Sequence, residues 1–246
     1  MKRVLLALTL GCGMTSAYAG PADYVNVPAV EYGEKEIDFK YGNDSNKDDT
    51  RTDAASIGFG WGVTPTWFTE VYAKWQRTTP DGTKFDAIEW ENKFQLTETG
   101  KYPIDIGLLT EVEITHEPSD PNEFKFGPLF QTEFGKLQLN GNLFFQRTFG
   151  GVLAEDEKRV TEISYQWQIK YRYQASFEFG AQGFGEMGEW NHWEPHNEQI
   201  HKLGPAIFGA IDLGNHRKIK YNAALLFSAS DAAPRRTFRL QTEYEF

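Results

Sequence analysis

The sequence has almost no cysteine, and its one cysteine falls close to the N-terminus. Cys12 lies within residues 1–19, where Lys2 and Arg3 precede an apolar run and Ala17-Tyr18-Ala19 offers small residues before a cleavage point. These features are typical of a secretory signal peptide. We therefore predict a signal peptide at 1–19 and one mature domain at 20–246, in which neither a disulfide nor a thiolate metal site can form.

Two alternatives fit residues 1–19 less well. A membrane anchor needs about 20 apolar residues, and the run of residues 4–10 is much shorter. Lipidation of Cys12 would call for leucine three positions earlier, where Thr9 stands.

Basic residues are scarce relative to acidic ones. Loss of Lys2 and Arg3 with the signal peptide leaves 23 basic residues against 35 acidic ones, so the formal net charge falls from −10 to −12. Nucleic acid binding calls for a basic face. The composition therefore excludes nucleic acid as an expected partner.

Long hydrophobic runs are also missing after residue 19, and the mean hydropathy is −0.55. Aromatic residues nevertheless make up 15% of the chain. Transmembrane β-barrels combine these two properties, because lipid-facing residues alternate with polar residues that face the interior. The composition favours an exported all-β chain.

Alternation of apolar and polar residues recurs from one end of the chain to the other. In residues 162–171, "EISYQWQIKY", aromatic and aliphatic side chains share one face and hydrophilic ones share the other. Similar patterns predict about twelve strands, which form an antiparallel transmembrane β-barrel. Their predicted ranges are 35–42, 56–63, 67–77, 85–96, 105–115, 124–134, 137–147, 162–171, 175–183, 203–212, 219–227 and 238–246.

The connections between these strands alternate between long polar loops and mostly short turns. Outer-membrane barrels have long loops outside and short turns on the periplasmic side. An even strand number then places both ends of the chain in the periplasm. Glycines 58, 60 and 62 interrupt one strand, and with no helix after them they indicate curvature or close packing rather than a phosphate loop.

The C-terminal stretch "FRLQTEYEF" alternates up to the last residue, although most chain ends gain little from being ordered. In a barrel this strand must pair with the first one so that no backbone group is unsatisfied in lipid. The stretch resembles the C-terminal signature of Gram-negative outer-membrane β-barrel proteins. That resemblance implies recognition by the barrel-assembly machinery through Phe238, Leu240, Tyr244 and Phe246.

Three further stretches, "VEYGEKEIDF", "FDAIEWENKFQLTETGKYP" and "LQTEYEF", are similar to uncharacterised proteobacterial outer-membrane proteins. The resemblance implies a location in the outer membrane, in contact with its lipid and lipopolysaccharide. It implies no activity.

Strand alternation also predicts which side chains line the lumen. On this face acidic residues outnumber basic ones, which favours cations or neutral solutes over anions if the lumen is hydrated. The alternative is that the charges pair across strands and fill the barrel. The predicted lining residues are Glu70, Glu89, Glu91, Asp105, Glu111, Glu113, Lys125, Glu133, Lys170, Glu178, Lys220 and Arg239.

Channels for acidic sugars resemble this chain in size and strand number, but their lumens are basic. The acidic lining therefore makes a uronate or sialate cargo doubtful. The leading hypothesis is a passive, porin-like channel for small solutes; the alternatives are a structural or surface-interaction barrel without an open pore and, third, an outer-membrane hydrolase. A soluble periplasmic barrel or sandwich is the alternative for the fold, and the pattern leaves the oligomeric state open.

Catalytic and metal-binding signals are weak. Only Ser119, three residues after His116, has a histidine near it in the sequence, and the "HxSN" phospholipase motif is missing, so we predict no catalytic residues and no cofactor. Residues 186–201 contain two tryptophans and three histidines. Their spacing fits no zinc motif, and an exposed aromatic loop is the preferred interpretation, so no metal site is predicted.

Overall fold

In the computed structural model, the structure describes residues 20–153 and 158–246, so the predicted signal peptide lies outside the described residues. No helix in these ranges is long and apolar enough to cross a membrane. The described strands are β1 (Lys35–Ser45), β2 (Arg51–Thr64), β3 (Trp67–Thr78), β4 (Lys84–Gln95), β5 (Asp105–Thr115), β6 (Asn122–Phe134), β7 (Leu137–Phe149), β8 (Thr161–Gln174), β9 (Phe177–Glu189), β10 (His192–Trp193), β11 (Ile200–Gly214), β12 (Arg217–Ser228) and β13 (Arg236–Glu245).

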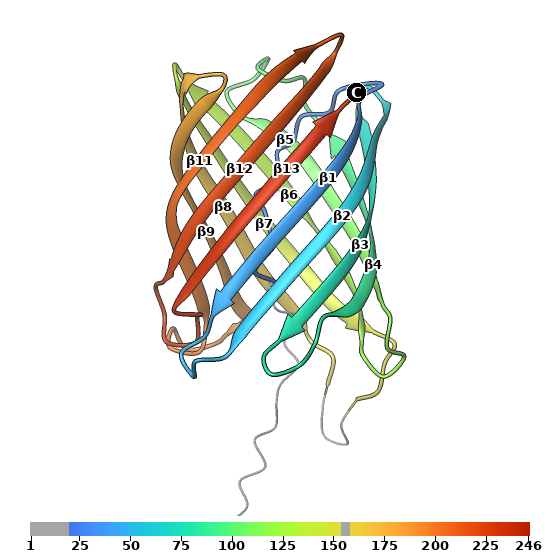
Figure 1. The fold of residues 1–246 in the computed structure, drawn as a ribbon, viewed down its shortest axis with the longest axis vertical. Helices are drawn as coiled ribbons and strands as arrows, with labels where there is room; N and C mark the ends of the chain where they lie inside the picture. The colour runs from blue at the N-terminus through green and yellow to red at the C-terminus, as the bar shows by residue number, and fades with distance from the viewer. Residues whose placement is uncertain (1–19, 154–157) are drawn as a thin grey trace, which may run out of the picture.

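Twelve of these strands form a closed antiparallel barrel, as predicted (Figure 1). The short β10 pairs with β9. Successive strands pair along the chain, and β13 pairs with β1 to close the sheet. The register at this seam runs from Glu36 opposite Glu245 to Ser45 opposite Arg236. The predicted pairing of the last strand with the first is confirmed, and it leaves no open edge.

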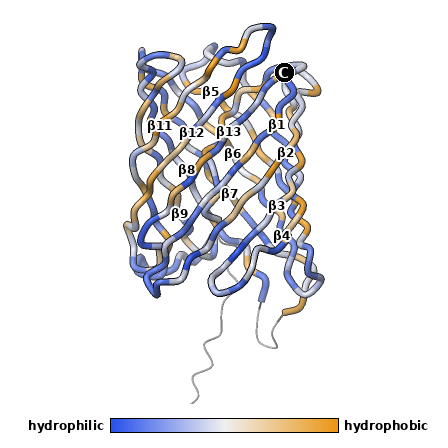
Figure 2. The backbone as a smooth tube through the Cα atoms, viewed as in Figure 1, coloured by the Kyte–Doolittle hydropathy of each residue, from blue (hydrophilic) through white to orange (hydrophobic). Residues whose placement is uncertain are grey.

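Period-two alternation separates an apolar outer face from a polar inner one. On β1, Ile37 and Phe39 are exposed, whereas Asp38 and Lys40 are buried inside the barrel. Figure 2 shows hydrophobic and hydrophilic residues alternating along the tilted strands. An exposed face of this composition is a liability in water but suits contact with lipid.

The two ends of the barrel differ in their connections. We call one end the long-loop end, where β1–β2, β3–β4, β5–β6, β7–β8, β9–β11 and β12–β13 are joined. At the other, the short-turn end, residues 65–66, 135–136, 175–176 and 215–216 join strands, with residues 96–104 as one longer connection. Several strands extend further toward the long-loop end than predicted, because polar residues such as Arg51 and Asp53 continue the pairing beyond the apolar alternation.

Residues 20–30 run through the inside of the barrel and an exposed turn at 31–33 leads to β1; we call residues 20–34 the lumen segment. Gly42 and Gly62 let it approach the wall: a Cβ at Gly42 would lie 2.0 Å from the Pro21 carbonyl oxygen, and one at Gly62 would lie 1.9 Å from that of Glu31. The predicted close packing at Gly62 is thus confirmed.

The sequence predicted that both ends of the chain lie on the short-turn side of the barrel, and the lumen segment corrects this for the first described residues. The start of β1 and the C-terminus lie together at the short-turn end, where the Phe246 amide donates to the Lys35 carbonyl at 2.9 Å. The lumen segment, however, reaches this end from the long-loop half of the barrel. An even number of strands places the start of the first strand and the end of the last strand at the same end of the barrel. It does not reveal that the segment before the first strand folds back inside.

Candidate functional site

The lumen contains two cavities on either side of the lumen segment. The long-loop cavity has a volume of about 230 Å³. The short-turn cavity has a volume of about 500 Å³. Tyr24, Asn26 and Glu91 line both, so the N-terminal half of the lumen segment forms the partition between them.

Hydrogen bonds and packing hold this partition in place. The Tyr24 hydroxyl donates to the Glu91 carboxylate at 3.0 and 3.1 Å. The Asn142 side chain donates to the Asn26 carbonyl at 3.0 Å. Val25 is buried in an apolar cluster whose other members are Phe184, Ala206, Phe208, Ala224 and Leu226.

One wall of the lumen is acidic. Across β3, β4 and β5, Glu70 stands opposite Glu91 and Glu91 opposite Glu111, while Glu89 stands opposite Glu113. Directly opposed like charges destabilise a sheet. The wall is therefore costly unless cations or water compensate it.

Two lysines compensate part of this wall. Lys74 forms ion pairs with Glu89, at 2.8 Å, and with Glu113. Lys125 contacts Glu111 at 2.7 Å. Carboxylates remain in excess, because the long-loop cavity is lined by seven acidic residues and three lysines, namely Asp23, Asp86, Glu89, Glu91, Glu111, Glu113 and Glu123 against Lys40, Lys74 and Lys125.

The rest of the wall, from β6 around to β1, carries amides, which a pattern of charged residues alone does not reveal. Hydrogen bonds of 2.7 to 3.5 Å join these side chains into a chain that we call the amide belt. Its members, from β6 around to β1, are Gln131, Gln138, Asn140, Gln168, Gln182, Asn222, Gln241 and Asp38. The alternation of polar residues on β7 and β8 is the signal that could have revealed it.

Lys40 lies where the two walls and the partition meet. Its ammonium is 3.5 Å from the ring centroids of both Tyr24 and Tyr72 and 3.5 Å from the Asp38 carboxylate. The Tyr72 hydroxyl donates to Asp38 at 2.8 Å. A cation held between two aromatic faces is attracted by both ring quadrupoles, so this arrangement helps to fix the lumen segment against β1 and β3.

The residues predicted to line the lumen do not all contact a cavity. Those that line one are Glu70, Glu89, Glu91, Glu111, Glu113, Lys125, Lys170, Glu178 and Lys220. Three lie elsewhere: Asp105 accepts from the Gly100 amide at 2.8 Å, Arg239 donates to Gln182, and Glu133 is exposed and paired with Arg172. Strand alternation also places Glu36, Asp38, Lys40, Lys74, Lys93 and Glu243 on the inner face, and these six line a cavity. The cavity-lining charges that it missed are Asp23, Glu31, Glu34, Asp86, Glu123, Arg172 and Lys218.

The residues predicted to act in assembly lie on β13, except Phe246, which directly follows it. Phe238 and Phe246 are exposed on the outer face, and Tyr244 stacks on Phe246 with ring centroids 5.7 Å apart. Leu240 is partly exposed between them. Recognition of this face by an assembly machinery stays a prediction.

The loop at 186–201 brings two of its three histidines together. His196 and His201 meet edge to face with centroids 5.2 Å apart, and the His201 ring also hydrogen bonds to the Tyr165 hydroxyl at 2.8 Å. His192 is exposed, as are Trp190 and Trp193. The geometry is that of an exposed aromatic loop.

Comparisons with known proteins extend these observations. No family model matches the chain, and no curated protein matches it. Among solved structures it is similar to the KdgM porin, with 9% identity and a TM-score of 0.55 over 86% of this chain and 99% of that one. It is also similar to an outer-membrane channel from Pseudomonas putida F1 (10% identity, TM-score 0.60, 91% and 98% covered) and to the NanC porin (8%, 0.54, 86% and 98%).

At these identities the similarity shows a shared fold. The chain has the fold of outer-membrane β-barrels, as the sequence predicted, and the expected location in the outer membrane agrees with it.

Proposed function

We propose that this protein is an outer-membrane channel for small solutes, with a lumen that favours cations or neutral molecules over anions. The observation that supports it most directly is the pair of charged cavities inside the barrel, one on each side of the lumen segment. The interior of an eight-stranded barrel is narrow enough for its own side chains to fill. Here unfilled polar space lies on both sides of a thin partition.

The charge of the cavities supports the proposed selectivity. The short-turn cavity is lined by eight acidic and five basic residues, and the long-loop cavity has a larger relative excess of acids. Rings and walls of carboxylates favour cation passage. One structural neighbour, KdgM, has been solved with oligogalacturonate; an acidic lumen would repel such a polyanion, so we do not extend that cargo to this chain.

The lumen segment supports a second candidate function. Because it separates the two cavities, the barrel as it stands resembles a closed scaffold, which would act through its surface rather than through a pore. The two functions differ in conductance. Purified protein in planar bilayers should show discrete cation-preferring steps if it is a channel, whereas a membrane-inserted barrel that never conducts would refute the channel.

The double variant Glu111→Gln with Glu113→Gln should reduce the preference for cations. Both carboxylates line the long-loop cavity, and a unit charge at 4 Å in water is worth about 1 kcal/mol. We expect the permeability ratio of K⁺ to Cl⁻, measured from reversal potentials, to fall several-fold. Glu117→Gln, in the exposed β5–β6 loop, is the control and should leave the ratio unchanged. An unchanged ratio in the double variant would show that ions do not pass this wall.

A further inference from the structure

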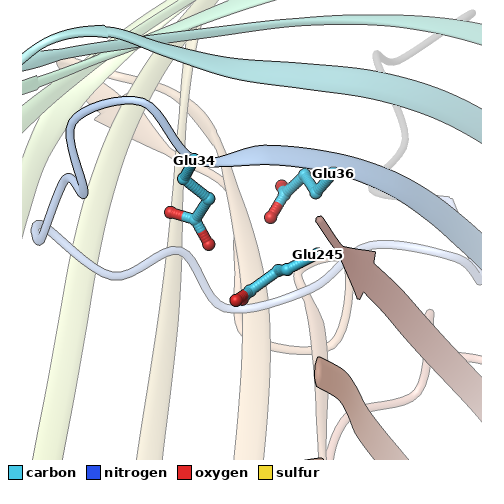
Figure 3. A group of neighbouring side chains, drawn as sticks. All are labelled: Glu34, Glu36 and Glu245. Carbon is cyan, nitrogen blue, oxygen red and sulfur yellow. The ribbon is translucent and has the colours of Figure 1, made fainter. Parts of the chain in front are cut away.

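Three carboxylates converge at the short-turn end of the lumen. Glu34 ends the lumen segment, Glu36 lies on β1, and Glu245 lies opposite Glu36 on β13. One oxygen from each lies within 4.8 Å of the others. Figure 3 shows the three side chains pointing toward one another from these three parts of the chain.

Glu36 is the member of this group without a direct ion pair. It is only 7% exposed and lines the short-turn cavity, and no hydrogen bond or ion pair joins its carboxylate to the residues that the structure describes. Lys93 and Lys220 act on it electrostatically without such a contact. Glu245, in contrast, contacts Lys218 at 2.5 Å as well as Lys220, and Glu34 contacts Lys220 at 3.4 Å. A buried carboxylate needs a cation, water or a proton to offset its desolvation.

The second group of neighbouring carboxylates has no buried member without an ion pair among the described residues. Glu89, Glu111 and Glu113 also lie close together, but Lys74 and Lys125 already pair with all three. The unpaired and buried Glu36 therefore distinguishes the group at the short-turn end.

We propose that Glu34, Glu36 and Glu245 bind a calcium-like divalent cation at the short-turn end of the barrel. Ca²⁺ takes oxygen ligands at 2.3–2.6 Å, so two ligands on opposite sides of it are about 5 Å apart. One oxygen of each carboxylate lies within 4.8 Å of the others, so all three can reach one cation between them. Mg²⁺ requires shorter distances and a stricter geometry, and it should bind more weakly. Water from the adjoining cavity would complete the coordination.

Lys220 is the built-in competitor for this cation. Its ammonium contacts Glu34 and Glu245 but also lies 3.6 Å from the Glu243 carboxylate, which can receive it when a divalent ion enters. The bound cation would then join the lumen segment to the β1–β13 seam. It would stabilise both the closed barrel and the partition, and this role does not depend on whether the pore conducts.

Calcium titration of the purified, EDTA-treated barrel tests this site. Isothermal titration calorimetry should show one Ca²⁺ bound by the native protein. Glu36→Gln should weaken binding by at least about tenfold, because loss of even an outer-shell partner costs about 10–100-fold in metal affinity. Glu178→Gln is the matched control, because Glu178 lines the same cavity but is paired with Lys170 at 3.2 Å. Its calcium affinity should equal that of the native protein.

Thermal unfolding separates cation binding from a structural effect of the substitution. Calcium should raise the unfolding temperature of the native protein and not that of Glu36→Gln, while without calcium Glu36→Gln should be at least as stable as the native protein because an unpaired buried charge is removed. Lys220→Gln should bind calcium more tightly. Absence of calcium binding in the native barrel, or equal binding by Glu36→Gln, would overturn the proposal.

Discussion

Deletion of residues 22–32 should produce a large increase in single-channel conductance. These residues form most of the lumen segment, which separates the 230 Å³ and 500 Å³ cavities. The twelve barrel strands pair without them, and the groups they contact, such as Glu91 and Lys40, would become hydrated instead. We expect large, frequent conductance steps in planar bilayers where the native protein shows small or rare ones.

A milder variant tests the same idea without shortening the chain. Val25→Gln places a polar group against Phe184, Phe208 and Leu226, and it forfeits about 1.5–3 kcal/mol of burial that holds the segment to the wall. Openings should become more frequent while their size stays that of the deletion variant. Val152→Gln, on an exposed loop residue, should leave conductance unchanged. If the deletion variant inserts, shows heat-modifiable migration and conducts like the native protein, the lumen segment is not the barrier.

Loss of Phe246 should severely reduce the amount of protein in the outer membrane. The residue completes the seam, because its amide donates to the Lys35 carbonyl, and its ring stacks on Tyr244. An incompletely closed seam leaves backbone groups unsatisfied in hydrocarbon at a cost of several kcal/mol each. Phe246→Asp should be at least as damaging, since it adds a charge to the outer face.

Membrane fractionation with heat-modifiable migration measures this effect. Val152→Asp in the β7–β8 loop is the control, because it adds the same charge at a residue that is 77% exposed. The control should reach native levels in the outer membrane. Normal levels of the Phe246 deletion would contradict the importance of the last residue, and recovery of the native protein in the soluble periplasmic fraction would contradict the proposed location.

The barrel was predictable because strand alternation is a local property of the sequence. Each strand shows its two faces within a few residues, as Ile37 and Asp38 do on β1. The closing pair was predictable for a related reason: an alternating strand at the very C-terminus has no stable place other than against the first strand. The predicted strand limits were too short mainly where polar residues continue the pairing toward the long-loop end.

The lumen was predicted only in part. Alternation identified its charged members, but the amide belt depends on which strands are neighbours, and Gln182 reaches Asn222 on β12 although β11 lies between their strands. The sequence likewise did not predict that some apolar residues, such as Leu109 and Phe144, point into the lumen. They cover the wall inside the barrel, against the general rule that apolar side chains face lipid.

By itself the sequence determined an acidic, all-β chain with twelve alternating strands and a closing C-terminal strand, because composition and period-two patterning are written into short stretches. Only the tertiary structure decided that residues 20–30 enter the lumen, that Tyr24 divides it, and that Glu34, Glu36 and Glu245 meet at one end. These arrangements join residues far apart in the chain. Their positions follow from barrel closure and strand register, which no local pattern specifies.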